Sequence, residues 1–243
     1  MLSSIYSVML GLLILTVFLP YGDMNGKHYK LPLAYAHSFE QNDMSTFLAL
    51  INRAQVELFL AISDFPANIS LASEHIENAA KLIDVVYRMD DDIVDDDDFM
   101  KRYDEVINSR NSSIHALGIA NIVDQVLIEY GKAYYIGYDL TNMSNIGNDS
   151  NELRRNLSSQ VDSAHYQTAL KLSERAYQAF KTLSWQPMSL TGDDSAFLTK
   201  LEDSLADLTN TVRDNASAQD LMVVAHHNVH PNLQVAYDLK LKR

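Results

Sequence analysis

Hydrophobic residues recur with a helical period along the chain from about residue 43 onward. In the first segment they are spaced alternately by four and three residues from Phe47 to Phe65, and Pro66 ends the segment because it has no backbone N–H to donate. A second helix is expected after Ser70, with one face formed by Ala72, His75, Ala79, Leu82, Val86 and Met89. The short connection predicts that the two helices are antiparallel neighbours.

The same spacing predicts helices over residues 113–138 and 152–184, and a further helix whose apolar row runs from Leu198 to Val212. A last helix should begin near Ser217, and we expect Pro231 to end or kink it. No segment alternates with the period of two that is typical of a half-buried strand. We therefore predict an all-α fold, an antiparallel bundle of four or five long helices with short accessory helices near residues 99–108 and at the C-terminus.

The N-terminal region has a different character. Residues 5–19 form an apolar run that is shorter than the roughly 20 residues of a spanning helix, and "AYA" at 34–36 has the small-x-small form of a cleavage site. Two features do not fit a cleaved signal: no Lys or Arg precedes the run, whereas Lys27 and Lys30 follow it, and the gap from Leu19 to Ala34 is long for a cleavage region. An uncleaved N-terminal anchor is therefore the alternative. Residues 1–36 are thus predicted to be a signal peptide or a membrane anchor, and residues 37–243 a helical-bundle domain outside the cytoplasmic membrane.

Asn-x-Ser/Thr triplets give separate support for export, because they accept glycans only on exposed parts of exported chains. An alternative interpretation is that these Asn and Ser residues cap helices and turns. Six asparagines begin such triplets: Asn68, Asn111, Asn142, Asn148, Asn156 and Asn215.

Charge and composition narrow the range of partners and cofactors. The net charge of −13 disfavours nucleic acid and anionic lipid headgroups, so we expect membrane contact only through the N-terminal segment and a protein partner at the cell surface. The chain has no cysteine, which excludes disulfides, thiolate metal sites and iron–sulfur clusters. Seven Asp residues between 90 and 98 do not have the spacing or the glycine of an EF-hand, so we interpret them as a solvated loop in which Asp95 to Asp98 lie at a helix N-terminus. A calcium site is the less favoured alternative.

The stretch "VVAHHNVHPNL" at 223–233 contains the densest group of histidines. His226 and His230 are four residues apart and share a helix face, as two metal ligands would. A third donor would have to come from another helix, and His165 or His75 are the candidates because each lies on an apolar row. The alternative interpretation is a helix C-terminus that carries polar histidines.

A metal shared by His75, His165 and His226 is a second hypothesis, because bundles hold metals between facing helices. Asp162-x-x-His165 has the spacing of a carboxylate–histidine pair, but the di-iron pattern needs two Glu-x-x-His motifs and two further Glu. We therefore expect buried, hydrogen-bonded histidines. No motif places a catalytic residue, so no enzyme and no cofactor is predicted, with a divalent metal as the alternative.

Two stretches, "AYAHSFEQ" at 34–41 and "LASEHIENAAKLID" at 71–84, resemble uncharacterised exported all-helical proteins of ammonia-oxidising archaea. The second stretch is also similar to helical extracytoplasmic domains of iron-permease systems, although the membrane helices and Glu-rich motifs of the permease are missing here. The resemblance implies export and an all-α domain, and it transfers no functional residue.

These observations favour a non-enzymatic exported domain, secreted or at the cell surface, with a structural or interaction role. A metal-binding or metal-delivery bundle is the first alternative. An extracytoplasmic sensor-like module is the second, although the residues after 43 supply neither a second membrane span nor an output domain.

Overall fold

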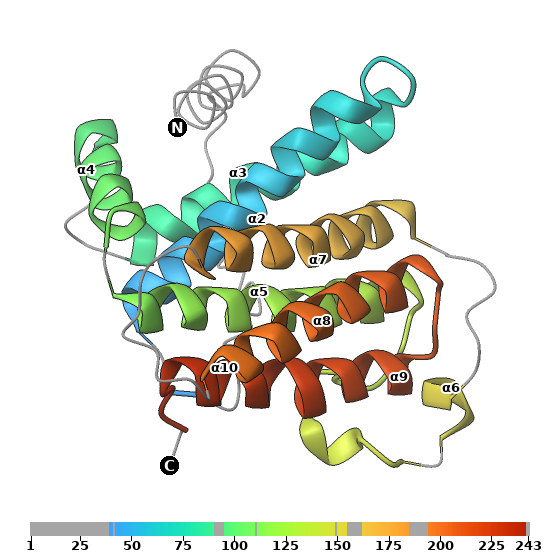
Figure 1. Cartoon of the computed structure of the whole chain (residues 1–243). Coiled ribbons are helices and arrows are strands. Elements are labelled where there is room, and N and C mark those ends of the chain that lie inside the picture. Colours follow the sequence, from blue (N-terminus) through green and yellow to red (C-terminus); the bar gives the residue numbers. More distant parts are fainter. Residues whose placement is uncertain are drawn as a thin grey trace.

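The computed structural model describes residues 39–40, 42–89, 95–109, 111–148, 150–154, 162–184 and 194–241 (Figure 1). The apolar run 5–19, the stretch 34–36, His37, the first three residues of the acidic run (90–92) and Asn156 lie outside these residues. Within the described part the fold is all-α, as predicted, and the one β interaction is an isolated antiparallel bridge between Phe39 and Leu241.

The first two long helices form a hairpin. α2 (Asp43–Asp64) is capped at its N-terminus by Asn42, whose side-chain oxygen accepts the backbone N–H of Met44, and it ends before Pro66. α3 (Ile69–Met89) returns along α2, and its predicted face is buried at Ala72, His75, Ala79, Leu82 and Val86. Phe65 is exposed, although it ends the predicted apolar row of α2, because the end of the hairpin projects beyond the neighbouring helices (Figure 1).

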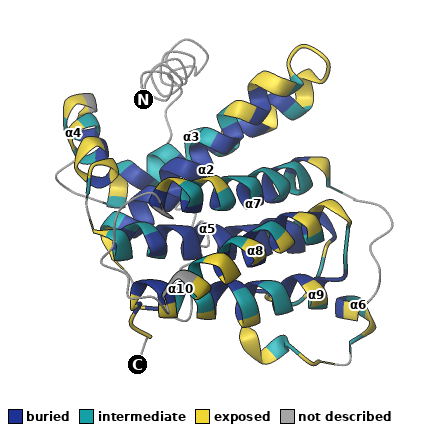
Figure 2. Ribbon diagram, viewed as in Figure 1, coloured by how far each residue is buried: buried dark blue, intermediate teal, exposed yellow. Residues whose placement is uncertain are grey.

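The central element is α5 (Ser112–Ala133), which is buried along most of its length (Figure 2). It packs against α2 and, most extensively, against α7 (Ser163–Ser184), while α8 (Asp194–Arg213) packs against α7. The predicted apolar row of α8 is fully buried at Leu201, Leu205, Leu208 and Val212. Five helices of 20 to 22 residues within the described part therefore confirm the predicted bundle.

Two helix boundaries differ from the prediction. The helix expected over 113–138 ends at Ala133, because Tyr135 adopts a left-handed conformation with a φ of 49°. The helix expected over 152–184 is not continuous: α6 (Asn151–Arg154) is separate, and α7 begins only at Ser163. Asp162 caps α7 by accepting the backbone N–H of His165 at 3.1 Å, and its own N–H binds the carbonyl of Ala133. An aspartate N-cap starts a helix where the periodicity alone had suggested continuity.

The C-terminal helix also differs from the prediction, which was that Pro231 ends or kinks it. α9 (Ala218–Val223) leads into a π-helical turn, η2 (Val224–Val229), and then into α10 (His230–Tyr237), so the helix continues past Pro231. Pro231 lies in the first turn of α10, where the hydrogen-bond register changes from π to α. A proline is tolerated in a first helical turn because its missing N–H has no required acceptor there.

The accessory helices agree with the sequence. α4 (Asp96–Ile107) is capped by Asp95, whose side-chain oxygen accepts the backbone N–H groups of Asp97 and Asp98, both at 3.0 Å. A short 3-10 helix, η1 (Met143–Asn145), lies in the connection between α5 and α6. The predicted placement of these aspartates at a helix N-terminus is thereby confirmed, and it requires no calcium ion to explain them.

Candidate functional site

The interior of the bundle contains a buried network of charged side chains centred on Arg53 of α2. The Nη2 atom of Arg53 donates to Oε1 of Glu129 on α5 at 2.7 Å, and Nη1 donates to the side-chain oxygen of Gln125. One helical turn after Arg53, Glu57 brings a second carboxylate 4.0 Å from the Nε atom of Arg53. Both glutamates are fully buried and Arg53 is 9% exposed, so the guanidinium group lies between two carboxylates away from water.

His75 of α3 extends the network on one side. Its Nδ1 atom lies 2.7 Å from Oε2 of Glu57, and its Nε2 atom lies 3.1 Å from Oε1 of Gln167 and 3.6 Å from a carboxylate oxygen of Asp64. Both ring nitrogens face oxygen acceptors, and a histidine ring can donate from both nitrogens only when it is protonated. The protonated form of His75 therefore fits this environment best. Burial acts to lower the pKa of His75, but the hydrogen bond and the charge of Glu57 outweigh it, and the pKa is raised.

His165 of α7 extends the network on the other side. Its Nδ1 atom is 2.5 Å from Oε2 of Glu129, and Nζ of Lys132 is 3.0 Å from Oε1 of the same carboxylate. Burial acts to raise the pKa of Glu129, but Arg53, His165 and Lys132 together lower it to about 2. The pKa of His165 is raised, because the hydrogen bond and charge of Glu129 outweigh the opposing effect of burial. The network therefore alternates positive and negative groups across α2, α3, α5 and α7.

This arrangement argues against a metal ion shared by the histidines of different helices. His75 and His165 do lie in one network, but each binds its own glutamate, and Arg53 lies between the two carboxylates. Among the described residues, no group of three or more His, Asp or Glu is arranged to hold a metal ion. The guanidinium group supplies the positive charge that the two buried carboxylates need.

One pattern in the sequence does indicate this network. Arg53, Glu57 and Glu129 are charged residues at positions within apolar helix faces, where ionisable side chains are rarely buried without a partner. Such positions are typical of buried ion pairs. They do not identify the partners, because Arg53 and Glu129 are 76 residues apart in the chain.

His226 and His230 form a separate cluster on the opposite side of α5. The rings are close, with centroids 5.2 Å apart, and both side chains are buried. The Nε2 atom of His226 is 3.0 Å from the carbonyl oxygen of Leu140, and Nε2 of His230 is 3.4 Å from a carboxylate oxygen of Asp124. The acidic neighbour is thus Asp124, whereas the proposed third donors, His165 and His75, contact Glu129 and Glu57.

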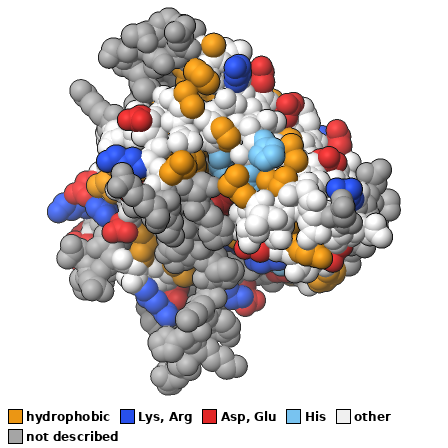
Figure 3. Space-filling model, turned by 90° about the horizontal axis from the view of Figure 1, so that it is seen from below, with side chains coloured by type: hydrophobic (Ala, Val, Ile, Leu, Met, Phe, Trp, Pro, Cys, Tyr) orange, Lys and Arg blue, Asp and Glu red, His pale blue; other side chains and the backbone are white. Residues whose placement is uncertain are grey.

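His226 lies in the π-helical turn η2, and His230 follows it as the first residue of α10. A π turn widens the helix and commonly occurs at functional positions. His226 and His230 are buried against α5, while His227 is exposed. Figure 3 shows the underside of the molecule, where histidine and hydrophobic side chains gather on one face.

The tip of the α2–α3 hairpin, defined here as residues 59–73, is the most apolar exposed part of the described chain. Its large side chains are exposed by 53% at Phe59, 56% at Ile62, 62% at Phe65 and 62% at Ile69. Figure 1 shows the tip projecting from the bundle, and Figure 2 shows its exposed surface. Exposed apolar side chains that lie together mark contact surfaces more often than singly scattered ones do.

The candidate glycosylation residues are mostly at the surface. Asn68, Asn111, Asn142 and Asn148 are exposed, and Asn215 is half-buried with its side-chain oxygen 2.5 Å from the hydroxyl of Tyr134. The first four side chains also accept a backbone N–H through their oxygen, from Leu71, Ser113, Ser144 and Ser150 respectively. These four asparagines therefore cap turns or helices in the fold, as the alternative interpretation expected. Their caps use the side-chain oxygen, so the amide nitrogen, which is the atom that carries a glycan, takes no part in these hydrogen bonds.

α2 is the one described helix that is long and apolar enough to cross a membrane by length and composition. However, 78% of its apolar window is buried inside the structure, and the helix carries Arg53 and Glu57 at the centre of the ionic network. These contacts support α2 as a core helix of the bundle.

No family model, curated protein or solved structure matches this chain. The resemblance to exported archaeal proteins and to iron-permease domains therefore stays a prediction from two short stretches. A function for this chain is therefore inferred from its own residues and their contacts.

The network predicts how stability depends on pH. His75 and His165 have raised pKa values, so the stability they contribute is complete below their ordinary value of 6.5 and is lost as the pH rises through the raised values. The free energy of unfolding in urea should therefore fall above pH 6.5, by up to about 1.4 kcal/mol per pH unit for each histidine. Below pH 4.5, protonation of Glu129 should destabilise the fold progressively toward pH 2.

Replacement of both histidines, His75→Gln with His165→Gln, should flatten the decline above pH 6.5, whatever its effect on absolute stability. His227→Gln, at an exposed position, serves as the matched control and should leave the slope unchanged. Equal slopes for the wild type and the double variant would contradict the protonated network.

The histidine pair predicts weak metal binding. Among the described residues, His226, His230 and the carboxylate of Asp124, 3.4 Å from His230, are not arranged as the three donors that a zinc site needs. Calorimetric titration of Zn²⁺ at pH 7.5 should give micromolar or weaker binding that changes little in His226→Ala or His230→Ala. Stoichiometric nanomolar binding that is lost in both variants would show that the pair is a metal site.

Proposed function

We propose that this chain is a non-enzymatic, exported interaction domain that self-associates through the tip of the α2–α3 hairpin. The observation that carries the proposal is that four large apolar side chains of the tip, Phe59, Ile62, Phe65 and Ile69, are each more than half exposed. Burial of such side chains against another protein releases apolar surface from water, which is the main favourable contribution to most protein association.

The charge distribution supports an apolar contact at this point. Asp64 is the one charged residue between positions 59 and 73, whereas 21% of the whole chain is charged. The carboxylate of Asp64 lies 3.6 Å from Nε2 of His75, so it is drawn toward the network and away from the tip surface. The tip has no Lys or Arg of its own that could attract an anionic membrane. The cation beside it, Nζ of Lys171 on α7, lies 4.9 Å from the ring centroid of Phe59 and pairs with Glu174 at 2.7 Å.

A second copy of the chain is the partner at the hairpin tip that best fits the distribution of charge over the molecule. Two molecules that each carry −13 repel one another, and contact between two projecting, nearly uncharged ends keeps the acidic bodies apart. Two-fold symmetric pairs, in which the same patch meets itself, are the commonest oligomers of soluble proteins. Four half-exposed side chains offer on the order of a few hundred Å² per copy, less than a standard interface, so the association should be weak and concentration-dependent.

Further features support the non-enzymatic and exported parts of the proposal. The ionisable side chains in the core, Arg53, Glu57 and Glu129, are bound to one another and shielded from solvent, as in a structural network. Export is supported by the apolar run at 5–19 and by the exposed Asn-x-Ser/Thr triplets. Asn68 lies within the tip, so the proposal requires this asparagine to be unmodified even where other triplets carry glycans.

Sedimentation equilibrium of the full chain should show a monomer–dimer equilibrium with a dissociation constant on the order of 100 µM, between the millimolar and micromolar values that correspond to about 4 and 8 kcal/mol. Phe65→Asp and Ile62→Asp should each weaken the dimer tenfold or more, because a charge would be buried in an apolar contact. Added NaCl should strengthen the dimer by screening the repulsion between the acidic bodies.

Val235→Asp on α10 is the matched control, since Val235 is also apolar and 52% exposed, and it should leave the equilibrium unchanged. A monomer at every concentration, or a dimer that both tip substitutions leave intact, would refute self-association through the tip. Binding of the monomer to phosphatidylcholine vesicles in place of dimerisation would refute it as well.

A further inference from the structure

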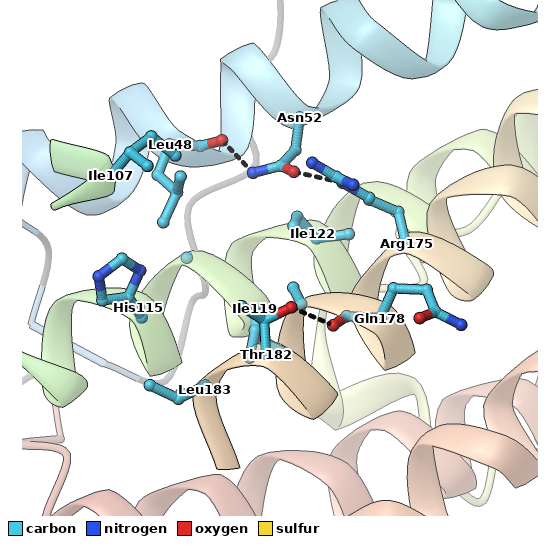
Figure 4. A pocket seen from close by; sticks show the side chains of 12 residues that line it. Leu48, Asn52, Ile107, His115, Ile119, Ile122, Arg175, Gln178, Thr182 and Leu183 are labelled. Carbon is cyan, nitrogen blue, oxygen red and sulfur yellow. Dashed lines mark hydrogen bonds between the residues drawn. The ribbon is translucent and has the colours of Figure 1, made fainter. Parts of the chain in front are cut away.

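A cleft of about 400 Å³ lies between α2, α5 and α7, close to the end of α4 (Figure 4). Its apolar walls include Leu48 of α2 and Ile119 and Ile122 of α5, and Ile107 lies at its edge. The volume is within the range of about 300–1,000 Å³ that small-molecule sites occupy. The cleft is separate from the hairpin tip, so ligand binding there does not depend on self-association through the tip.

Arg175 of α7 is the positive side chain of this cleft. Figure 4 shows it reaching from α7 toward Asn52 of α2, with Ile122 of α5 beside it. Its Nε atom donates to the side-chain oxygen of Asn52 at 2.5 Å, and Nη2 donates to that of Gln55 at 3.0 Å. Asn52 is oriented for this contact because its own amide nitrogen donates to the carbonyl of Leu48 at 2.7 Å.

The two acceptors of Arg175 are neutral amides. Within the part of the chain that the structure describes, no carboxylate lies within ion-pair distance of Arg175, in contrast to Arg53, which binds Glu129. Desolvation by burial lowers the pKa of Arg175, which reflects the cost of holding this charge without an anionic partner. Two of the five N–H donors of the guanidinium group are used, so donors remain for a planar anion.

The composition of the cleft departs from that of the whole chain. The chain has 32 acidic and 19 basic residues, yet the cleft lining includes Arg175 and no Asp or Glu among the described residues. The local field therefore favours an anion in a protein that repels anions elsewhere. Arg175, with Ile122 beside it and Ile119 one turn away on α5, matches a ligand with a charged head and an apolar body.

We propose that this cleft binds a small monocarboxylate with a hydrocarbon tail, with the carboxylate held by Arg175 and the tail lying against Ile119 and Ile122. A guanidinium group binds a carboxylate through two parallel hydrogen bonds, which gives the site a preference for a planar anion. The apolar walls make the tail contribute to affinity, which distinguishes the site from a general anion site.

Hexanoate is a suitable probe for calorimetric titration of the full chain, with hexylammonium, acetate and inorganic phosphate as comparisons. Hexanoate should bind with a dissociation constant below about 1 mM, and acetate and phosphate at least tenfold more weakly. Hexylammonium should not bind, because its charge has the wrong sign. No binding of hexanoate at about 10 mM, or equal binding of hexylammonium or phosphate, would overturn the proposal.

Two variants identify the site. Arg175→Gln removes the charge, and Gln55→Glu places a carboxylate of the same shape against Nη2 of Arg175, where it competes with the ligand. Each should weaken hexanoate binding at least tenfold, and Gln55→Glu should do so without loss of thermal stability, because it adds an ion pair. Should Arg175→Gln fail to fold, Gln55→Glu alone decides.

The matched controls make the same charge changes elsewhere: Arg213→Gln at an exposed arginine of α8 and Gln234→Glu on α10. Both should bind hexanoate like the wild type. Equal affinity in the wild type and in Gln55→Glu, or equal weakening by the controls, would show that hexanoate does not bind at Arg175.

Discussion

The position of Arg53 between Glu57 and Glu129 is the interaction on which the rest of the bundle depends. Two fully buried carboxylates cannot remain ionised in a protein interior without a nearby positive charge, because desolvation of each costs several kcal/mol. Arg53 provides this charge to α2 and α5 together. His75 and His165 then attach α3 and α7 to the same pair of carboxylates, so four helices meet in one set of hydrogen bonds.

A network of this kind sets the register of the helices more than it adds stability. Apolar side chains of similar volume would often pack as well, whereas each ionic contact is satisfied in only one alignment of α2, α3, α5 and α7.

The bundle also places its charged groups in different surroundings. Arg53 has a carboxylate partner within the core, Arg175 has neutral amide partners beside an open cleft, and the hairpin tip has almost no charge. The central groups hold the fold, and the last two are the places at which binding is proposed.

Much of the fold follows from the sequence, because burial of one face gives each long helix a regular apolar spacing. That spacing predicted α2, α3 and α8 together with their buried faces, and Asp95 was correctly placed at the start of α4. The boundaries near Ala133, Ser163 and Pro231 were wrong because they depend on single backbone groups. Asp162 accepts one N–H and Tyr135 adopts one left-handed conformation, and neither changes the hydrophobic period.

The candidate sites were harder to predict, because they form between helices that are distant in the chain. The sequence placed His75 and His165 on apolar faces, and the structure joins them through two glutamates and an arginine, a residue that does not bind metals. His226 and His230 were paired correctly by their spacing of four residues, but their acidic neighbour, Asp124, lies about a hundred residues away on α5. The cleft at Arg175 has no sequence motif, since its residues come from four helices, α2, α4, α5 and α7.

A double-mutant cycle between Arg53 and Glu129 tests the central claim most directly. The free energies of unfolding of the wild type, Arg53→Met, Glu129→Gln and the double variant would be measured in urea at about pH 6, where both histidines are protonated. Each single substitution should cost about 3–5 kcal/mol because it leaves a buried charge without its partner, and the double variant should cost much less than the sum, with a coupling energy of about 3 kcal/mol. A coupling energy below about 0.5 kcal/mol, as independent sites show, would contradict the account.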